Sequence, residues 1–161
     1  MNLLPQLEQV CAGLNGVYGA NMARVRQDCL DLMRECPSLH PHRDSFMHNN
    51  GTESTLIVLR GTVPIYYQRN RYNIPVDVWI PALYPQAAPL AYVTPTATMI
   101  VAPNHRHCDR EGKVYLPYLH QWNPQHSNLK TCVVGCGFWF CRCLSACSTF
   151  LERSGRAPRT S

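Results

Sequence analysis

Prolines are concentrated in the middle of this chain, and they constrain its fold more than any other feature. Eleven of the 13 prolines lie between Pro37 and Pro124 in a chain of 161 residues. Because proline lacks a backbone N–H and breaks helix interiors, this density excludes a helical bundle, a coiled coil or a Rossmann unit. Proline is tolerated at strand edges and in ordered loops. The sequence therefore predicts a sheet with extended loops, and 45% hydrophobic residues suffice for one domain with a core.

The positive charge of the chain is concentrated near its C-terminus. The net charge is +5, but four arginines beyond residue 141, opposed only by Glu152, leave just +2 on residues 1–141. A nucleic-acid-binding domain gathers basic residues on one face. We therefore expect no nucleic-acid partner.

The cysteines indicate a reducing compartment. There are nine, an odd number, with five between Cys132 and Cys147, and the N-terminus has no basic region followed by an apolar run. We expect a cytosolic chain with reduced thiols. The run 132–151 is about long enough to cross a bilayer. Arg142 at its centre would cost roughly 2.5–3.5 kcal/mol, so no membrane span is expected.

Apolar residues between 21 and 36 recur at helical spacing. Asn21 can cap the start of such a helix, and Pro37 ends the run. We interpret the apolar stripe as core. Its members are Met22, Val25, Cys29, Leu32, Met33 and Cys36.

From residue 39 the pattern changes to short β-forming runs. Asn49-Asn50-Gly51 is a hairpin signal, because Asn and Gly tolerate positive φ. Pro75 indicates an edge or a bulge. Residues 103–124 are expected to form an ordered loop segment of the kind that often carries function. The strands of an antiparallel meander are predicted at 46–48, 55–59, 72–80, 90–93 and 99–101.

Four motifs occur in order along the chain: YNIP at 72–75, YP at 84–85, P-T-x-x-M at 95–99 and GKVYLPYLHQW at 112–122. On these motifs, residues 18–129 resemble the UEV (ubiquitin E2 variant) domain, above all that of the vacuolar-sorting subunit of ESCRT-I. The resemblance implies an α+β, ubiquitin-conjugating-enzyme-like fold: an N-terminal helix, a four-stranded antiparallel meander, a loop-rich segment and C-terminal helical packing. Residues 1–17 are then an N-terminal extension, and residues 130–161 an atypical tail, Cys-rich and then basic.

The resemblance also implies that the chain is not an enzyme. UEV domains resemble ubiquitin-conjugating enzymes that have lost the cysteine following a G-x-(I/V) turn. Here Gly112-Lys113-Val114 is followed by Tyr115, which stands at the cysteine position. A phenol with a pKa of about 10 cannot form a thioester at neutral pH. No cofactor is implied.

The residues near Tyr115 suggest two other uses, a catalytic cysteine and a zinc site. Cys108 could act as a nucleophile, but Asp109 beside it disfavours the thiolate. A zinc set is the second, although a His-x-His-Cys run lacks the paired spacing of structural sites. We expect neither a catalytic cysteine nor a metal. The zinc set would combine His105, His107 and Cys108 with His120 or His126.

A ubiquitin site is the first binding function that the resemblance implies. Ubiquitin offers an apolar patch with a basic rim, and family members meet it with the first hairpin as a tongue, with help from the sheet and a neighbouring loop. Asn50 stands where the family often has an acid, so a charge is lost. Trp79 alternates with Ile80 in a strand and could instead be core. The implied ubiquitin-binding residues are Met47, Asn49, Asn50, Trp79 and Tyr92.

A groove for P-(S/T)-A-P peptides is the second implied function. A polyproline II peptide has a preformed backbone and docks between aromatic rings. One wall of the groove normally comes from a C-terminal stretch with Pro-Pro, which this chain replaces with its Cys-rich tail. The residues that match the groove are Tyr67, Tyr72, Asn73, Thr96 and Met99.

Together these features predict a non-catalytic ubiquitin-binding module of ubiquitin-dependent endosomal sorting, cytoplasmic and recruited to endosomes. Its expected partners are ubiquitin or ubiquitinated cargo, proline-motif peptides of adaptor proteins and, in a longer form, ESCRT-I subunits. One alternative is a cofactor subunit for an active ubiquitin-conjugating enzyme in chain formation. The other is a truncated fragment that does not fold.

Overall fold

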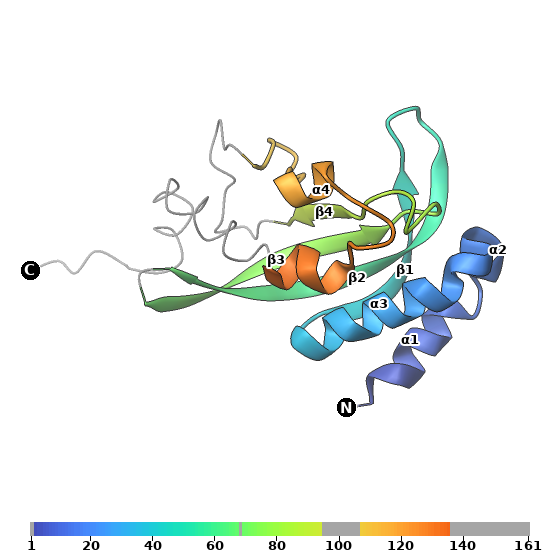
Figure 1. The fold of residues 1–161 in the computed structure, drawn as a ribbon, viewed down its shortest axis with the longest axis horizontal. Helices are drawn as coiled ribbons and strands as arrows, with labels where there is room; N and C mark the ends of the chain where they lie inside the picture. The colour runs from blue at the N-terminus through green and yellow to red at the C-terminus, as the bar shows by residue number, and fades with distance from the viewer. Residues whose placement is uncertain (1, 68, 95–106, 136–161) are drawn as a thin grey trace, which may run out of the picture.

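The computed structural model describes residues 2–67, 69–94 and 107–135. The four strands form an antiparallel sheet in the order β1-β2-β3-β4, which confirms the predicted α+β meander (Figure 1). The strands are β1 (His40–Met47), β2 (Glu53–Tyr67), β3 (Asn70–Ile80) and β4 (Leu90–Val93). The helical elements are α1 (Leu3–Cys11), α2 (Asn15–Tyr18), the 3-10 turn η1 (Gly19–Asn21), α3 (Met22–Glu35), α4 (Pro117–His120) and the π-helical turn η2 (Thr131–Gly135).

The predicted helix over 21–36 is α3, and every member of its apolar stripe is buried, which confirms the core interpretation. The expected cap is wrong. Asn21 has helical backbone angles and makes no side-chain capping hydrogen bond, because η1 runs directly into α3 and leaves no extended residue to serve as a cap. Cys36 ends the helix, immediately before Pro37.

The predicted strands 55–59, 72–80 and 90–93 lie within β2, β3 and β4, and 46–48 overlaps the end of β1; 99–101 lies outside the described residues. The carbonyl of Pro75 accepts the N–H of Thr94 at 3.0 Å, so the proline nitrogen on the same side of the strand points away from β2. β4 ends at Val93, opposite Val76. Pro75 therefore lies at a local edge of β3, as predicted.

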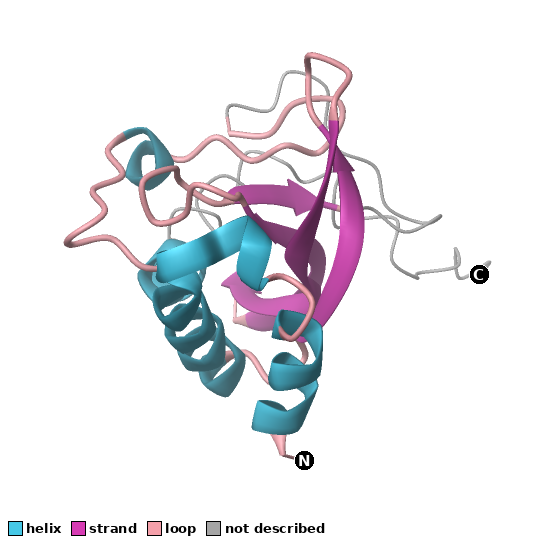
Figure 2. Cartoon of the chain, turned by 90° about the vertical axis from the view of Figure 1, so that its right-hand side faces the viewer, coloured by secondary structure: helices cyan, strands magenta, loops and turns pink. Residues whose placement is uncertain are grey.

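The helices gather on one side of the twisted sheet (Figures 1 and 2). We call this side the inner face and the other the outer face. Ile57 and Ile80 pair on the inner face and are fully buried. The buried hydroxyl of Tyr18 ties them together, donating to the carbonyl of Ile80 at 2.8 Å and accepting the N–H of Ile57 at 2.9 Å. Burial raises the pKa of Tyr18.

Close backbone approach explains the glycine at position 61. A Cβ on Gly61 would collide with the carbonyl oxygen of Ser38. The connection between α3 and β1 can therefore cross β2 only where the residue has no side chain.

The N-terminal segment contributes to the same core as the rest of the domain. Leu7, Cys11 and Leu14 are at most 2% exposed and belong to the hydrophobic cluster that contains α3 and the sheet. α1 packs against both α3 and β1. Residues 3–14 therefore pack as part of the domain.

Candidate functional site

The outer face carries an open hollow between the end of β1, strands β3 and β4, and a turn near residue 111. Three of the residues predicted for ubiquitin binding line this outer hollow: Met47, Trp79 and Tyr92. Asn49 and Asn50 lie in the adjacent turn. The full lining is Ser45, Phe46, Met47, Asp77, Trp79, Tyr92, Val93, Thr94 and Glu111.

Aromatic rings form the floor of the outer hollow. The ring of Phe46 lies 5.0 Å from that of Trp79 and 6.4 Å from that of Tyr92, measured between centroids. Trp79 is only 8% exposed, so its side chain belongs to the core and also forms part of the floor of the outer hollow. The interpretation of Trp79 as core is therefore compatible with its predicted place in the ubiquitin site. Offset and tilted ring pairs of this kind are favourable beyond their buried area. The floor is therefore a rigid apolar surface.

The β1–β2 turn, residues 48–52, projects beside the hollow and has the predicted hairpin geometry. Gly51 has φ +82°, a conformation in which a side chain is strained. The Oδ1 atom of Asn50 accepts the N–H of Thr52 at 3.0 Å and its hydroxyl at 2.6 Å. Next to this turn, Met47 is 60% exposed. We call Met47 and residues 48–52 the tongue.

Charged groups cross the sheet beside the aromatic floor. The guanidinium of Arg60 lies over the Trp79 ring, 5.8 Å from its centroid. It pairs with Asp77 at 3.2 Å from one side and with Asp44 at 3.3 Å from the other. Because two carboxylates surround one guanidinium, this group of three side chains carries a net negative charge.

A short turn over residues 107–115 closes the far side of the hollow. Its residues 112–114 pair with the edge of β4 that β3 does not cover. The N–H of Val93 donates to the carbonyl of Gly112, and the N–H of Val114 donates to the carbonyl of Ala91, both at 2.8 Å. A Cβ on Gly112 would meet the carbonyl of Val93, so this approach also requires glycine.

The side chain of Tyr115 is held within this turn by a hydrogen bond and a cation. Its hydroxyl donates to Asp109 at 3.1 Å, and this hydrogen bond raises the pKa of Tyr115 above its ordinary value. Lys113 lies over its ring, with Nζ 5.5 Å from the centroid. Cys108, the alternative nucleophile, is 8% exposed and follows His107. No cysteine is among the described residues that line the outer hollow.

The alternative zinc set does not assemble in the part of the chain that the structure describes. No three His, Cys, Asp or Glu side chains there are arranged to hold a metal ion. His105 lies outside the described residues. Over the same described ranges, each helix is too short or too polar to cross a membrane. Most of the run 132–151 lies beyond them.

The residues predicted for the peptide groove are only partly described. Tyr72 pairs with Ile65, and Asn73 pairs with Pro64, so alternation puts them on opposite faces of β3. Both precede the stretch of β3 that β4 covers. One extended peptide could contact both only along this edge. The backbone of Tyr67 pairs with Asn70 across the hairpin, while Thr96 and Met99 lie outside the described residues.

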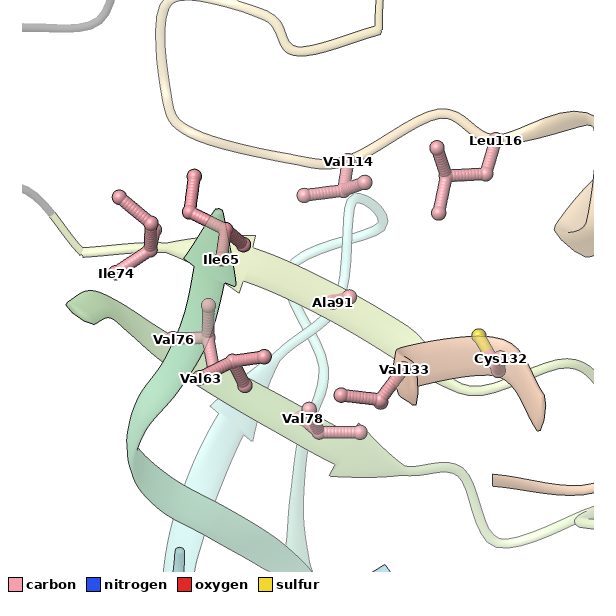
Figure 3. Close-up of a pocket in the computed structure, with 10 residues that line it drawn as sticks. All are labelled: Val63, Ile65, Ile74, Val76, Val78, Ala91, Val114, Leu116, Cys132 and Val133. Carbon is pink, nitrogen blue, oxygen red and sulfur yellow. The ribbon is translucent and has the colours of Figure 1, made fainter. Parts of the chain in front are cut away.

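A small apolar cavity lies on the inner face beneath η2, at the end of the described chain (Figure 3). Along β3 its residues alternate with those of the outer hollow. We call it the inner cavity. It is lined by Val63, Ile65, Ile74, Val76, Val78, Ala91, Val114, Leu116, Cys132 and Val133.

Sequence reasoning missed Phe46, Asp77 and Glu111 as lining residues of the outer hollow. Strand alternation could have found Asp77, which lies two residues before Trp79 on the same face. Glu111 carries no comparable signal, because only the pairing of residues 112–114 with β4 brings it to the rim.

Comparison with known proteins agrees with this architecture. The model of the UEV domain family matches residues 13–136. Protein ELC of Arabidopsis thaliana is 43% identical over 110 residues, which are 68% of this chain and 28% of ELC. The ESCRT-I complex subunit tsg101 of Dictyostelium discoideum is 34% identical over 114 residues, 69% of this chain and 24% of that protein. The chain spans about a quarter of the length of these relatives.

Two solved structures share the fold. A complex of the Vps23 UEV with ubiquitin superposes with a TM-score of 0.71 at 26% identity, covering 85% of this chain and 94% of that one. The yeast Vps23 UEV domain in complex with a Vps27 PSDP peptide gives a TM-score of 0.70 at 24% identity, covering 83% of this chain and 89% of that one.

Proposed function

This chain belongs to the UEV family, and we propose that it is a non-catalytic ubiquitin-binding module of ubiquitin-dependent endosomal protein sorting. The observation that carries the proposal is the outer hollow, where a rigid aromatic floor lies between an exposed methionine and carboxylate groups. Ubiquitin presents an apolar patch with a basic rim, which is the complement of such a surface. A related UEV, that of Vps23, forms a complex with ubiquitin.

Each predicted residue has a distinct role in this proposal. Met47 contributes exposed apolar area at the base of the tongue, and Asn49 and Asn50 offer polar contacts in its turn. Tyr92 is half-buried and can donate from its hydroxyl at the edge of the floor. Trp79 acts mainly by packing against the ring of Phe46 and so supporting the floor.

The absence of conjugating activity follows from the residue at position 115. Tyr115 stands where conjugating enzymes carry their cysteine, and its hydroxyl is hydrogen-bonded to Asp109. The raised pKa of Tyr115 keeps the phenol protonated at neutral pH, so it is no nucleophile. Cys108 is buried beside the same carboxylate and offers no replacement.

A proline-motif peptide is the second proposed ligand, held along the edge of β3 by Tyr67, Tyr72 and Asn73 together with Thr96 and Met99. Tyr72 is half-buried, as expected for a ring that forms one side of a groove, and Asn73 is exposed. The related Vps23 domain takes a PSDP peptide. The adaptor peptide and ubiquitinated cargo would recruit this cytoplasmic chain to endosomes. Assembly with ESCRT-I subunits belongs to a longer form.

Titration of the chain into isotope-labelled ubiquitin, followed by amide shifts in NMR, tests the ubiquitin proposal. We expect saturable shifts confined to the apolar patch of ubiquitin, weakened by Met47→Ala and Asn49→Ala. A folded sample that causes no shifts at millimolar concentration would refute ubiquitin binding. A cooperative thermal melt of the same sample distinguishes that result from a chain that does not fold.

The alternative role in chain formation has its own test. An active ubiquitin-conjugating enzyme is mixed with ubiquitin with and without this chain. We expect no difference between the two reactions. Chain formation that depends on the added protein would favour the cofactor role over sorting.

A further inference from the structure

The turn at residues 109–113 is held by one carboxylate. Asp109 accepts the N–H of Glu111 at 3.0 Å and the N–H of Lys113 at 2.9 Å through Oδ1, and the hydroxyl of Tyr115 at 3.1 Å through Oδ2. An aspartate engaged in this way is part of the local backbone structure. It fixes the direction in which the tip of the turn points.

Glu111 stands at that tip, on the rim of the outer hollow, and is exposed. Its carboxylate forms no ion pair with any residue that the structure describes, whereas Asp44 and Asp77 share Arg60. Neither neighbouring cation, Arg110 or Lys113, lines the hollow. Of the carboxylates that line the hollow in the described part of the chain, Glu111 is therefore the one without a cationic partner.

The charge of Glu111 reaches the floor of the hollow. Tyr92 has a raised pKa, first through burial and then through the negative charges of Asp109 and Glu111. Tyr92 lines the hollow together with Glu111. A cation brought to this rim would therefore meet a carboxylate beside an apolar surface, where charge pairs are less screened than in open water.

On the opposite side of the hollow lies the tongue, which itself carries no carboxylate; the nearest is that of exposed Glu53, which pairs with Met47 across β1 and β2 but does not line the hollow. The tongue carries Asn50, which is neutral, and its Oδ1 already accepts two hydrogen bonds from Thr52. The tongue can thus contribute apolar area and amide donors but no carboxylate. Among the described residues that line the hollow, Glu111 is therefore the carboxylate open to a basic ligand, because Asp77 is paired with Arg60.

We propose that Glu111 is a ubiquitin-binding residue, which pairs with a basic side chain at the rim of the apolar patch of ubiquitin. This inference rests on the proposed function and names a contact within the same site. The contact is an exposed one, so it governs salt dependence and association more than the total affinity.

The test compares Glu111→Gln with Glu35→Gln by titration into isotope-labelled ubiquitin. Glu35 is a matched control, an exposed glutamate paired with Lys130 beside α3, away from the hollow. Glu111→Gln is expected to weaken binding about threefold at low ionic strength, as exposed ion pairs do. The difference in affinity between Glu111→Gln and the unmodified chain should vanish at about 0.5 M salt, where charges are screened within a few ångströms. Glu35→Gln should bind like the unmodified chain at both salt concentrations.

A double-mutant cycle identifies the partner charge. Each basic residue at the rim of the ubiquitin patch is replaced in turn by alanine, and one of these variants should bind Glu111→Gln and the unmodified chain equally. If the unmodified chain binds ubiquitin and Glu111→Gln binds as well at low salt, the role of Glu111 is refuted while the proposed function stands. If the unmodified, folded chain does not bind ubiquitin, the proposed function itself fails.

Discussion

Along β3 the outer hollow and the inner cavity are lined by alternating residues, yet their linings are opposite in character. Asp77, Trp79 and Tyr92 face the hollow, and Val76, Val78 and Ala91 face the cavity. Every sheet residue of the cavity is apolar, whereas the hollow combines aromatic rings with carboxylates. A period of two along a strand thus separates the residues that hold the fold together from those available to a partner.

Truncation of a buried inner-face side chain should give the largest effect. Ile80→Ala is expected to lower the free energy of unfolding by about 3 kcal/mol, because Ile80 is fully buried and its loss leaves a cavity. Chemical denaturation measures this. Leu83→Ala removes an apolar side chain that is 69% exposed and should change the free energy by less than about 0.5 kcal/mol. Weakened ubiquitin binding by folded Ile80→Ala would show that the two faces are not independent.

Removal of a buried hydrogen bond on the helix side of the sheet should have the next largest effect on stability. The hydroxyl of Tyr84 donates to Asp28, which also accepts from Arg24 at 2.7 Å. Tyr84→Phe should cost about 2 kcal/mol in the free energy of unfolding, as the loss of a buried hydrogen bond to a charged group does. Ubiquitin affinity should be unchanged. An unaltered denaturation midpoint would contradict this role for Tyr84.

Alkaline pH should reduce the difference between Tyr84→Phe and the unmodified chain. Burial, and then the hydrogen bond to Asp28, raises the pKa of Tyr84 in the folded state. The stabilisation by the protonated hydroxyl is complete below the unfolded pKa of about 10 and is lost as the pH rises above it. Denaturation curves at several pH values test this, and a constant difference between the two proteins above that pH would refute it.

Truncation on the outer face should change binding more than stability. Tyr92→Ala is expected to weaken ubiquitin binding about tenfold, because Tyr92 is a half-buried ring on the floor of the hollow. Tyr92→Phe keeps the ring and should bind within about twofold of the unmodified chain. Calorimetric or NMR titration provides the affinities. If Tyr92→Ala binds ubiquitin as tightly as the unmodified chain does, the aromatic floor is not part of the ubiquitin-binding site.

A charge added to the tongue should have the smallest effect. Asn50→Asp keeps the oxygen that accepts from Thr52 and adds a negative charge, so binding should tighten about twofold at low salt. Asn123→Asp is the matched control, since Asn123 Oδ1 accepts the N–H of Gln125 in a similar turn on the α3 side of the molecule. Tightening by both variants alike would indicate a general effect of net charge.

Local pattern was sufficient for the elements and for part of the site. The stripe of α3, the Asn-Asn-Gly turn and the edge position of Pro75 are all properties of neighbouring residues, and the structure confirms them. Asn21 shows the limit of local reasoning. It has the chemistry of a cap, but the preceding 3-10 turn joins the helix directly and leaves it no capping role.

The sequence by itself determined the sheet, the helix and the alternation that assigns Trp79 and Val78 to different faces, because these follow from spacing along one segment. Only the tertiary structure decided which distant residues share the outer hollow. Phe46 reaches Trp79 through the pairing of three strands, and Glu111 reaches the rim because Gly112 allows its turn to dock on β4. Such contacts depend on chain crossings that no local periodicity encodes.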